Sequence, residues 1–200
     1  MSRDARRGQH ALDAVDWPKR TERLAIRRMR ADDAAAMWEY RRLEEVSRWL
    51  TSWWRDRDEF IEKIRHPDRL AATLVVERDN QVIGDLMLLI EDAWAQTDVA
   101  DRAAGVQAEL GWVLHPDVTG NGYGTEVVRE LLRICFEDLG LRRVIGQCFA
   151  VNEPSWRLME RLGMRREVHA VRESLHRDLG WLDGFGYALL ADEWRDRSRS

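Results

Sequence analysis

Apolar positions along the chain follow two different periods, and together they predict a domain that mixes helices with strands. Apolar residues spaced three or four apart predict a helix after Asp32-Asp33, a second from Asp56 or Asp58 to His66-Pro67, and a long third over 122–139. Alternation of apolar and polar residues predicts strands over 23–29, 72–78, 82–90, 107–114, 143–149, 165–174 and 184–191. A shorter helix follows Asn152, because Pro154 suits a first helical turn and Gly163 suits a helix end.

The segments between these elements predict one domain preceded by an arm. Asp79-Asn80-Gln81 is typical of a hairpin turn between two strands, and the polar residues 91–106 predict a connection. Residues 1–20 are polar and show little periodicity, so we expect a loosely ordered, flexible N-terminal arm. A single domain is expected over 21–196, since 200 residues with 44% hydrophobic content are enough for one sizeable core.

Charge and cysteine content narrow the class of protein. The formal net charge is -4, which gives no electrostatic argument for nucleic acid binding. No apolar run is long enough to span a bilayer or to form the core of a signal peptide, so we expect no membrane partner. Cys135 and Cys148 lie in apolar segments, and we expect both to be reduced, as in a cytoplasmic protein.

The strand over 107–114 is followed by a glycine-rich loop, in which Gly120, Gly122 and Gly124 alternate with Asn121 and Tyr123. Closely spaced glycines allow backbone N–H groups to turn toward one point. The N-terminus of the following helix adds four unpaired N–H groups and a partial positive charge. The loop therefore predicts a phosphate or pyrophosphate site, with an ordinary tight strand-to-helix turn as the alternative. Its spacing differs from that of a dinucleotide-binding loop, and it has no Walker lysine.

Several motifs resemble the GNAT acyltransferase superfamily. These are T-G-N-G-Y-G-T after V-L-H-P, the later N-E-P-S-W-R-L-M-E-R-L-G-M, and the order of the predicted elements. Further segments are similar to its ribosomal-protein N-terminal acetyltransferase (Rim-type) branch, namely Thr21-Glu22-Arg23-Leu24, Glu109-Leu110-Gly111-Trp112 and Asp192-Glu193-Trp194. The resemblance covers about residues 20 to 195. It implies an α+β fold with a twisted mixed sheet, helices on both faces, and a splayed strand pair formed by 107–114 and 143–149.

The resemblance also implies a site for acetyl-CoA as co-substrate, with no metal. Its pyrophosphate is expected at the loop residues Thr119, Gly120, Asn121, Gly122, Tyr123, Gly124 and Thr125. Family members usually open this loop with Gln or Arg, and this chain has Thr119 instead. The pantetheine arm is expected along the backbone of Trp112, Val113 and Leu114, with Asn152 bonding to it and Ser155 near the sulfur. The alternatives are core packing for Trp112 and Val113, and helix capping for Asn152 or Ser155.

Glu109 and Ser155 are the candidate catalytic residues. A carboxylate within an apolar strand is costly to bury, so Glu109 is expected either to bind and deprotonate the amine through water or to form a structural ion pair. Many family members place a tyrosine acid where this chain has Met159, which leaves Ser155 as the acid candidate. His176 is a weaker base candidate. Neither Cys135 nor Cys148 lies in a nucleophile-like setting, so the amine is expected to attack the thioester directly.

The acceptor is expected to be a primary amine. The branch resemblance favours a protein N-terminus, with a small amine such as an antibiotic or a polyamine as the alternative. A module that senses acetyl-CoA without turnover is a further alternative, because the tyrosine is missing. Trp49, Trp53 and Trp54, together with loop 175–184 and its Trp181, are expected to wall the acceptor site or to pack against the sheet. Free sheet edges and the 91–106 connection allow a homodimer.

Overall fold

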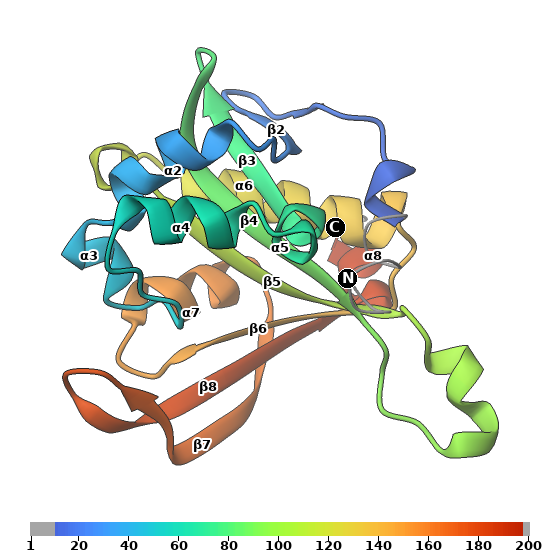
Figure 1. Cartoon of the computed structure of the whole chain (residues 1–200). Coiled ribbons are helices and arrows are strands. Elements are labelled where there is room, and N and C mark those ends of the chain that lie inside the picture. Colours follow the sequence, from blue (N-terminus) through green and yellow to red (C-terminus); the bar gives the residue numbers. More distant parts are fainter. Residues whose placement is uncertain (1–10, 198–200) are drawn as a thin grey trace.

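One continuous eight-stranded sheet organises residues 11–197, which the computed structural model describes (Figure 1). Its strand order is β1-β2-β3-β4-β5-β6-β8-β7. The strands are β1 (Lys19–Arg20), β2 (Ala25–Arg28), β3 (Thr73–Arg78), β4 (Gln81–Glu91), β5 (Gln107–Leu114), β6 (Arg143–Phe149), β7 (Arg165–His176) and β8 (Gly180–Leu190). Every neighbouring pair is antiparallel except β5 and β6, which run parallel. The sheet is therefore mixed, as expected from the sequence.

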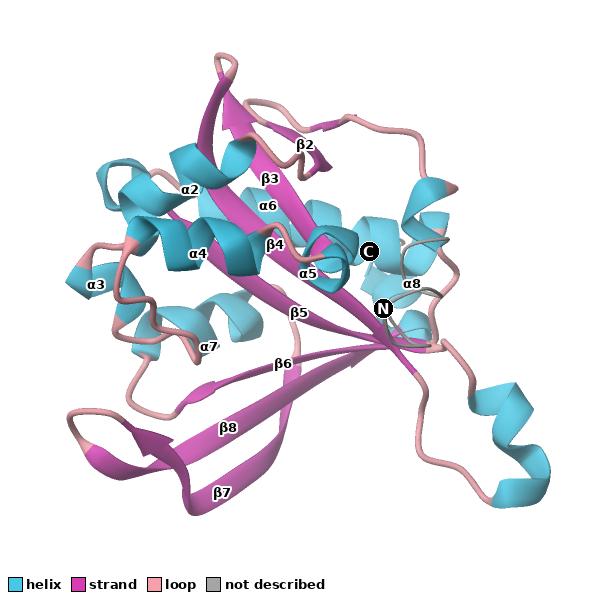
Figure 2. Cartoon of the chain, in the orientation of Figure 1, coloured by secondary structure: helices cyan, strands magenta, loops and turns pink. Residues whose placement is uncertain are grey.

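Helices cover both faces of the sheet (Figure 2). They are α2 (Asp33–Arg41), α3 (Glu44–Ser47), α4 (Arg57–Ile64), α5 (Pro67–Ala72), α6 (Tyr123–Arg133), α7 (Glu153–Arg161) and α8 (Ala191–Arg197). Alternation along β3 explains how one strand serves two layers. Leu74 and Val76 belong to the apolar cluster that contains α6, whereas Val75 belongs to the cluster that contains α2 and α4. The α+β fold predicted from the sequence is confirmed.

The sheet is split between β5 and β6. These strands pair only where Gln107–Glu109 meets Arg143–Ile145, whereas β4 and β5 pair over eight positions. Beyond Glu109 the two strands diverge, and α7 lies near the open end of the gap between them (Figure 2). The predicted splayed strand pair is therefore confirmed. The split places the unpaired edge of β5 beside the start of both α6 and α7.

Three elements differ from their predicted form. The helix predicted to stop at His66-Pro67 does so, since α4 ends at Ile64, but Pro67 also begins a further short helix, α5, because proline is well tolerated in the first turn. The helix predicted over 122–139 is α-helical through Arg133 and then continues as a π-helical turn, Ile134–Asp138. Strands β7 and β8 extend into the predicted loop 175–184, which leaves a short turn at 177–179.

Residues 11–20 form part of the packed fold, in contrast to the loosely ordered arm expected there. Residues 11–13 are helical and Leu12 is fully buried. Trp17 donates a hydrogen bond from Nε1 to the Leu12 carbonyl at 2.8 Å, and β1 follows. The apolar residues of this segment span only 11–17, which is too short a run for periodicity to show its packing. Residues 1–10, the rest of the expected arm, lie outside the described residues.

The connection between β4 and β5 forms an arm that projects from the sheet (Figure 1). It carries a 3₁₀ helix, Thr97–Ala103, and its base is closed by a hydrogen bond from the Ala93 N–H to the Ala103 carbonyl. Trp94 on this arm is 95% exposed. Self-association through the arm or the free β7 edge stays a prediction. Among residues 11–197, no helix is long and apolar enough to cross a membrane.

Candidate active site

The glycine loop presents free backbone N–H groups at the start of α6. Gly120 and Gly122 both have φ of +79°, a left-handed conformation that favours glycine. Gly122 is the N-cap and no side chain caps the helix. The first intrahelical bond runs from the Glu126 N–H to the Gly122 carbonyl. The N–H groups of the three residues between them therefore point out of the helix end, an arrangement that fits a pyrophosphate.

The side chains of the loop stabilise its shape. Thr119 donates from Oγ1 to the Pro116 carbonyl at 2.8 Å, and Asn121 donates from Nδ2 to the carbonyls of Val118 and Thr119. Thr119, which stands where the family usually has Gln or Arg, therefore bonds within the loop. Thr125 accepts a hydrogen bond from Arg161 at 2.9 Å, which brings a cation from α7 to the helix end.

Gly124 and Tyr123 face inward. A Cβ at Gly124 would lie 3.1 Å from Leu158 Cδ1 and 3.7 Å from Leu114 Cδ1. Gly124 therefore allows α6 to pack closely on α7 and β5, so its missing side chain does not make room for a phosphate. The Tyr123 side chain is buried in the same core, so Tyr123 offers only its main chain to the loop.

The open edge of β5 is the candidate binding line for an extended chain. The His115 N–H donates to the Ile83 carbonyl on the β4 side at 2.8 Å. Since main-chain groups alternate along a strand, those of Trp112 and Leu114 point to the gap and those of Val113 point to β4. The side chains of Trp112 and Leu114 pack against the core on the α6 face.

Ser155 and Asn152 lie at the start of α7, opposite this edge. Asn152 is the N-cap by position, but its side chain makes no capping bond, which leaves its amide available. Ser155 makes a hydrogen bond with the Cys148 thiol, which partly offsets the effect of burial that raises the pKa of Cys148 to about 11. Burial also raises the pKa of Cys135 far above its usual range. Both thiols are therefore protonated at neutral pH, which disfavours a covalent mechanism.

Glu109 occupies the last paired position of β5, at the apex of the gap. It is half-buried, and desolvation raises the pKa of its carboxyl, with a smaller contribution from the nearby Glu91. Over residues 11–197 no cation forms a salt bridge with Glu109. The alternative of a structural ion pair is thus disfavoured. A carboxylate with a raised pKa at the apex of a gap is well suited to accept a proton.

The other two candidate positions face away from this chemistry. Met159 is fully buried, and a Cβ at Gly146 would lie 2.8 Å from its sulfur, so this position points into the core. His176 is also buried, although we expected it in a loop between strands. Its Nδ1 accepts from the N–H groups of Asp178 and Leu179, and its Nε2 donates to the Arg48 carbonyl at 2.9 Å. With both nitrogens committed, His176 is not a base.

The aromatic residues divide between packing and the wall of the gap. Trp54 packs on Phe60 of α4 with ring centroids 6.2 Å apart, so it joins the helix layer. Trp49 lies 5.6 Å from the His176 ring and 6.3 Å from Phe149, which connects the end of α3 to β6 and the β7–β8 hairpin. The two segments expected to wall the acceptor site, the tryptophan segment and loop 175–184, therefore contact each other through Trp49 and His176. Trp53 and Trp181 are exposed.

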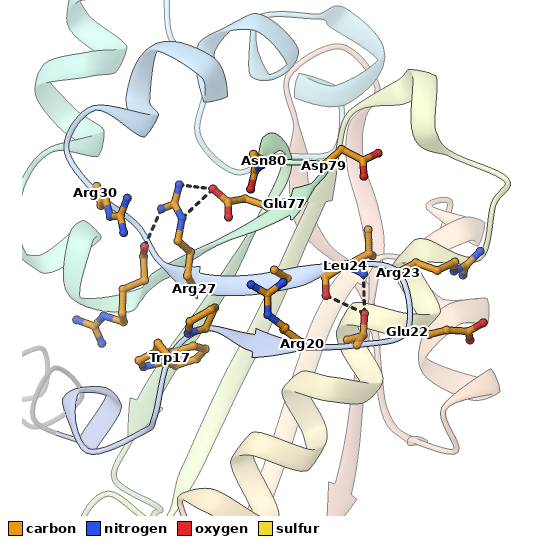
Figure 3. Close-up of a pocket in the computed structure, with 14 residues that line it drawn as sticks. Trp17, Arg20, Glu22, Arg23, Leu24, Arg27, Arg30, Glu77, Asp79 and Asn80 are labelled. Carbon is orange, nitrogen blue, oxygen red and sulfur yellow. Dashed lines mark hydrogen bonds and ion pairs between the residues drawn. The ribbon is translucent and has the colours of Figure 1, made fainter.

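A pocket of about 760 Å³ lies elsewhere, beside β1, β2 and the β3–β4 turn (Figure 3). Arg27 of β2 lines the pocket and is bound by Asp33 and Glu77, each at 2.7 Å. Glu109 and Ser155 are not among its lining residues. The pocket meets the glycine loop through Arg23, whose Nη1 donates to the Asn121 carbonyl at 3.0 Å. This contact had no predicted role, although Arg23 belongs to the Thr21–Leu24 motif.

Comparison with known proteins identifies the family. The model of the acetyltransferase (GNAT) domain matches residues 23–165. The chain belongs to the GNAT acetyltransferase family. Its activity is therefore transfer of an acetyl group to an amine. The uncharacterized N-acetyltransferase YnaD of Bacillus subtilis (strain 168) is 26% identical over 178 residues, which cover 87% of this chain and 97% of YnaD.

Solved structures agree with this assignment. A GNAT acetyltransferase from Bacillus anthracis has a TM-score of 0.74 and 26% identity, covering 88% of this chain and 100% of that one. Ribosomal-protein-S5-alanine acetyltransferase from Vibrio fischeri has a TM-score of 0.72 at 17% identity, covering 90% and 99%. Spermidine N-acetyltransferase from Vibrio cholerae, in complex with CoA and spermine, also has 0.72, at 19% identity, covering 86% and 98%. The last two show the fold alone.

Proposed function

We propose that this N-acetyltransferase takes its acetyl group from acetyl-CoA and transfers it to the α-amine of a protein N-terminus. The proposal rests on one observation: an anion site, the gap between β5 and β6 and a carboxylate lie in line. The free N–H groups after Gly122 lie at one end, the unpaired edge of β5 leads away from them, and Glu109 lies at the apex. This arrangement suits a long donor with a pyrophosphate at one end and a reactive thioester at the other.

Each residue has a proposed task. The loop residues 119–125 bind the pyrophosphate, and the main chain of Trp112 and Leu114 aligns the extended pantetheine arm of acetyl-CoA. The amine nitrogen attacks the thioester carbon, the carbon–sulfur bond breaks, and the thiol leaves. Glu109 accepts the amine proton through water, and Ser155 donates a proton to the departing sulfur. Asn152, which makes no capping bond, is available to bind the pantetheine arm. This assignment needs no covalent intermediate on the enzyme.

Two observations support the proposed acceptor, one through its positive charge and one through its class. Glu91 and Glu109 are close enough for Glu91 to raise the pKa of the Glu109 carboxyl, so the apex of the gap is acidic. The motifs Thr21–Leu24 and Asp192–Trp194 are similar to the Rim-type branch, and one structural neighbour is named for a ribosomal protein. A polyamine is the second candidate, because the same acidic apex also favours a small polycation.

The free thiols of Cys135 and Cys148 support a reducing, cytoplasmic location.

The deciding experiment is thiol release with two matched panels of acceptors. One panel holds short peptides that differ in their first residue, and each peptide has an Nα-blocked control. The other panel holds diamines and polyamines. We expect kcat/KM to be highest for a subset of free N-termini and to vanish on blocking. Faster transfer to polyamines than to every peptide would reject the N-terminal acceptor, and acetyl-CoA binding without turnover on either panel would reject both acceptor classes.

A further inference from the structure

The segment Thr21–Arg23 binds the first turn of α6 through one carboxylate. Glu126 receives hydrogen bonds at Oε1 from the Thr21 hydroxyl and the Arg23 N–H. At Oε2 it receives the Arg23 guanidinium, with Nε at 2.8 Å and Nη2 at 2.6 Å. Four donors therefore converge on a side chain located next to the proposed pyrophosphate site.

The same guanidinium touches the glycine loop itself. Nη1 of Arg23 donates to the Asn121 carbonyl at 3.0 Å, and its central carbon lies 4.5 Å from the centre of the Tyr123 ring. A Cβ at Gly122 would lie 3.6 Å from Nη2 of Arg23. One side chain from the start of the domain thus contacts Asn121, Tyr123 and Glu126, which lie about 100 residues later in the sequence and surround the N-cap of α6.

Charge gives this contact a consequence for binding. A carboxylate in the first helical turn suits the helix dipole, but it repels an anion at the same helix end. Only 14% of the Glu126 side chain is exposed, so water screens its charge weakly, whereas 42% of the Arg23 side chain is exposed. The ion pair neutralises Glu126 and leaves a guanidinium on the outer side of the loop.

We propose that Arg23 is a positioning residue for acetyl-CoA. Arg23 holds the loop through the Asn121 carbonyl and masks the charge of Glu126 from the pyrophosphate. The inference rests on the proposed function, because it takes the loop as the pyrophosphate site. Thr21 supports the same arrangement by donating to the second carboxylate oxygen, Oε1, while Oε2 accepts from the Arg23 guanidinium.

A double-mutant cycle tests the masking. Arg23→Met leaves Glu126 charged without its partner, and we expect the Kd for acetyl-CoA to rise roughly tenfold or more, the scale of a lost charge-assisted interaction. Glu126→Gln removes the repelling charge, so its effect should be roughly threefold or less. The double variant Arg23→Met/Glu126→Gln should bind acetyl-CoA more tightly than Arg23→Met alone. The kcat at saturating acetyl-CoA should stay near that of the parent in all three.

Two further measurements separate masking from a structural salt bridge. Raising the salt concentration screens the repulsion, so the deficit of Arg23→Met relative to the parent should shrink. Arg23→Lys keeps a cation but loses the planar fork, and it should bind between the parent and Arg23→Met. Arg133→Met is the matched control. Arg133 lies in the last turn of the same helix and pairs with Glu130 and Asp138, so its loss should leave acetyl-CoA affinity unchanged.

The outcomes distinguish this inference from the proposed function. A folded parent that does not bind acetyl-CoA overturns both. A parent that binds acetyl-CoA, with an Arg23→Met variant that binds as tightly as Arg133→Met, overturns the role of Arg23 alone. The same conclusion follows if the double variant binds no better than Arg23→Met, since a purely structural pair gives that result. Should Arg23→Met fail to fold, Arg23→Lys and Glu126→Gln carry the comparison, and equal losses in both overturn the masking.

Discussion

Glu109 occupies an environment that disfavours its charge. Desolvation, and secondarily the charge of Glu91, raise the pKa of its carboxyl in the folded chain. A raised pKa means that the folded state binds the proton more tightly than the unfolded state. The resulting penalty on stability is fully present above the folded pKa and disappears below the unfolded value, which is about 4.3 for glutamate. The Glu109 carboxylate in the gap therefore costs stability at neutral pH.

Glu109→Gln is expected to raise the melting temperature and to lower activity at the same time. The amide removes the buried charge, so the gain in stability should be largest at neutral pH and should fade as the pH approaches 4. If Glu109 accepts the amine proton, kcat should fall by roughly 100-fold or more. Thermal unfolding between pH 4 and 8 and thiol release check both effects. A variant with parent activity would remove Glu109 from the mechanism.

Ser155 and Cys148 should respond differently to removal. Ser155→Ala is expected to lower kcat by roughly tenfold, the scale of one lost hydrogen bond in the reaction, with little change in the affinity for acetyl-CoA. Cys148→Ala should keep acetyl transfer, because a thiol with a pKa of about 11 holds almost no thiolate at neutral pH. Loss of all transfer in a folded Cys148→Ala variant would indicate a covalent route. Steady-state rates with acetyl-CoA varied measure both variants.

Residue types singled out candidate residues but did not predict which distant residues surround them. Glu109 could be singled out because a carboxylate interrupts an apolar strand, and the strand and its neighbours are local in sequence. The burial of His176 could not be predicted, because His176 meets Arg48, 128 positions away, only through the fold. The partner of Glu126 is likewise 103 positions away. Pairs that meet through the fold leave no mark in a single sequence.

At the scale of elements, periodicity succeeded where burial is regular. Alternation predicted β3 to β6. Residues of β3, β4 and β5 belong to both apolar clusters, and β6 places Val144 and Cys148 in the cluster that contains α6. Periodicity could not predict the π-helical turn at Ile134–Asp138, since the apolar spacing there is nearly the same as in an α-helix. It also missed the packing of residues 11–20, where Leu12 and Val15 are buried in the core. Short elements lack the repeats that a period needs.

We expect the glycines of the loop to have two separate functions, ligand binding for Gly122 and close packing for Gly124, and two substitutions distinguish them. Gly122 has a positive φ, so Gly122→Ala imposes strain of about 1–2 kcal/mol and should weaken acetyl-CoA binding roughly tenfold. Gly124→Val would press on Leu158, and overpacking of this kind costs about 1–3 kcal/mol. It should lower the melting temperature more than Gly122→Ala does.

Calorimetric titration with acetyl-CoA and thermal unfolding measure the two effects. Gly120→Ala is a useful comparison, because Gly120 shares the positive φ but no atom lies near its Cβ position. If Gly122→Ala folds normally and binds acetyl-CoA as tightly as the parent, the left-handed glycine serves the turn and not the ligand.

For the whole molecule, one cluster joins the two halves of the split sheet. Trp49, at the end of α3, packs against Phe149 of β6 and His176 of β7. Ser47 adds a hydrogen bond from Arg177 at 3.2 Å, and Ser47 and His176 are both almost fully buried. These contacts link the helix layer to the β7–β8 hairpin on the far side of the gap between β5 and β6. These contacts therefore help to set the width of the gap on the side where we propose that the acceptor binds.

His176→Phe tests this link while preserving an aromatic ring. The phenyl ring can still pack on Trp49 and Phe149, but the Arg48 carbonyl and the N–H groups of Asp178 and Leu179 lose their partners. Leaving buried polar groups unpaired costs about 1–3 kcal/mol, so the melting temperature should fall. KM for the acceptor should rise more than KM for acetyl-CoA, because the cluster lies on the proposed acceptor side and the glycine loop is untouched. His169→Phe is the control, since His169 is an exposed histidine of the same strand. Equal changes in both KM values, or equal destabilisation by the two variants, would show that the His176 contacts do not set the acceptor side of the gap.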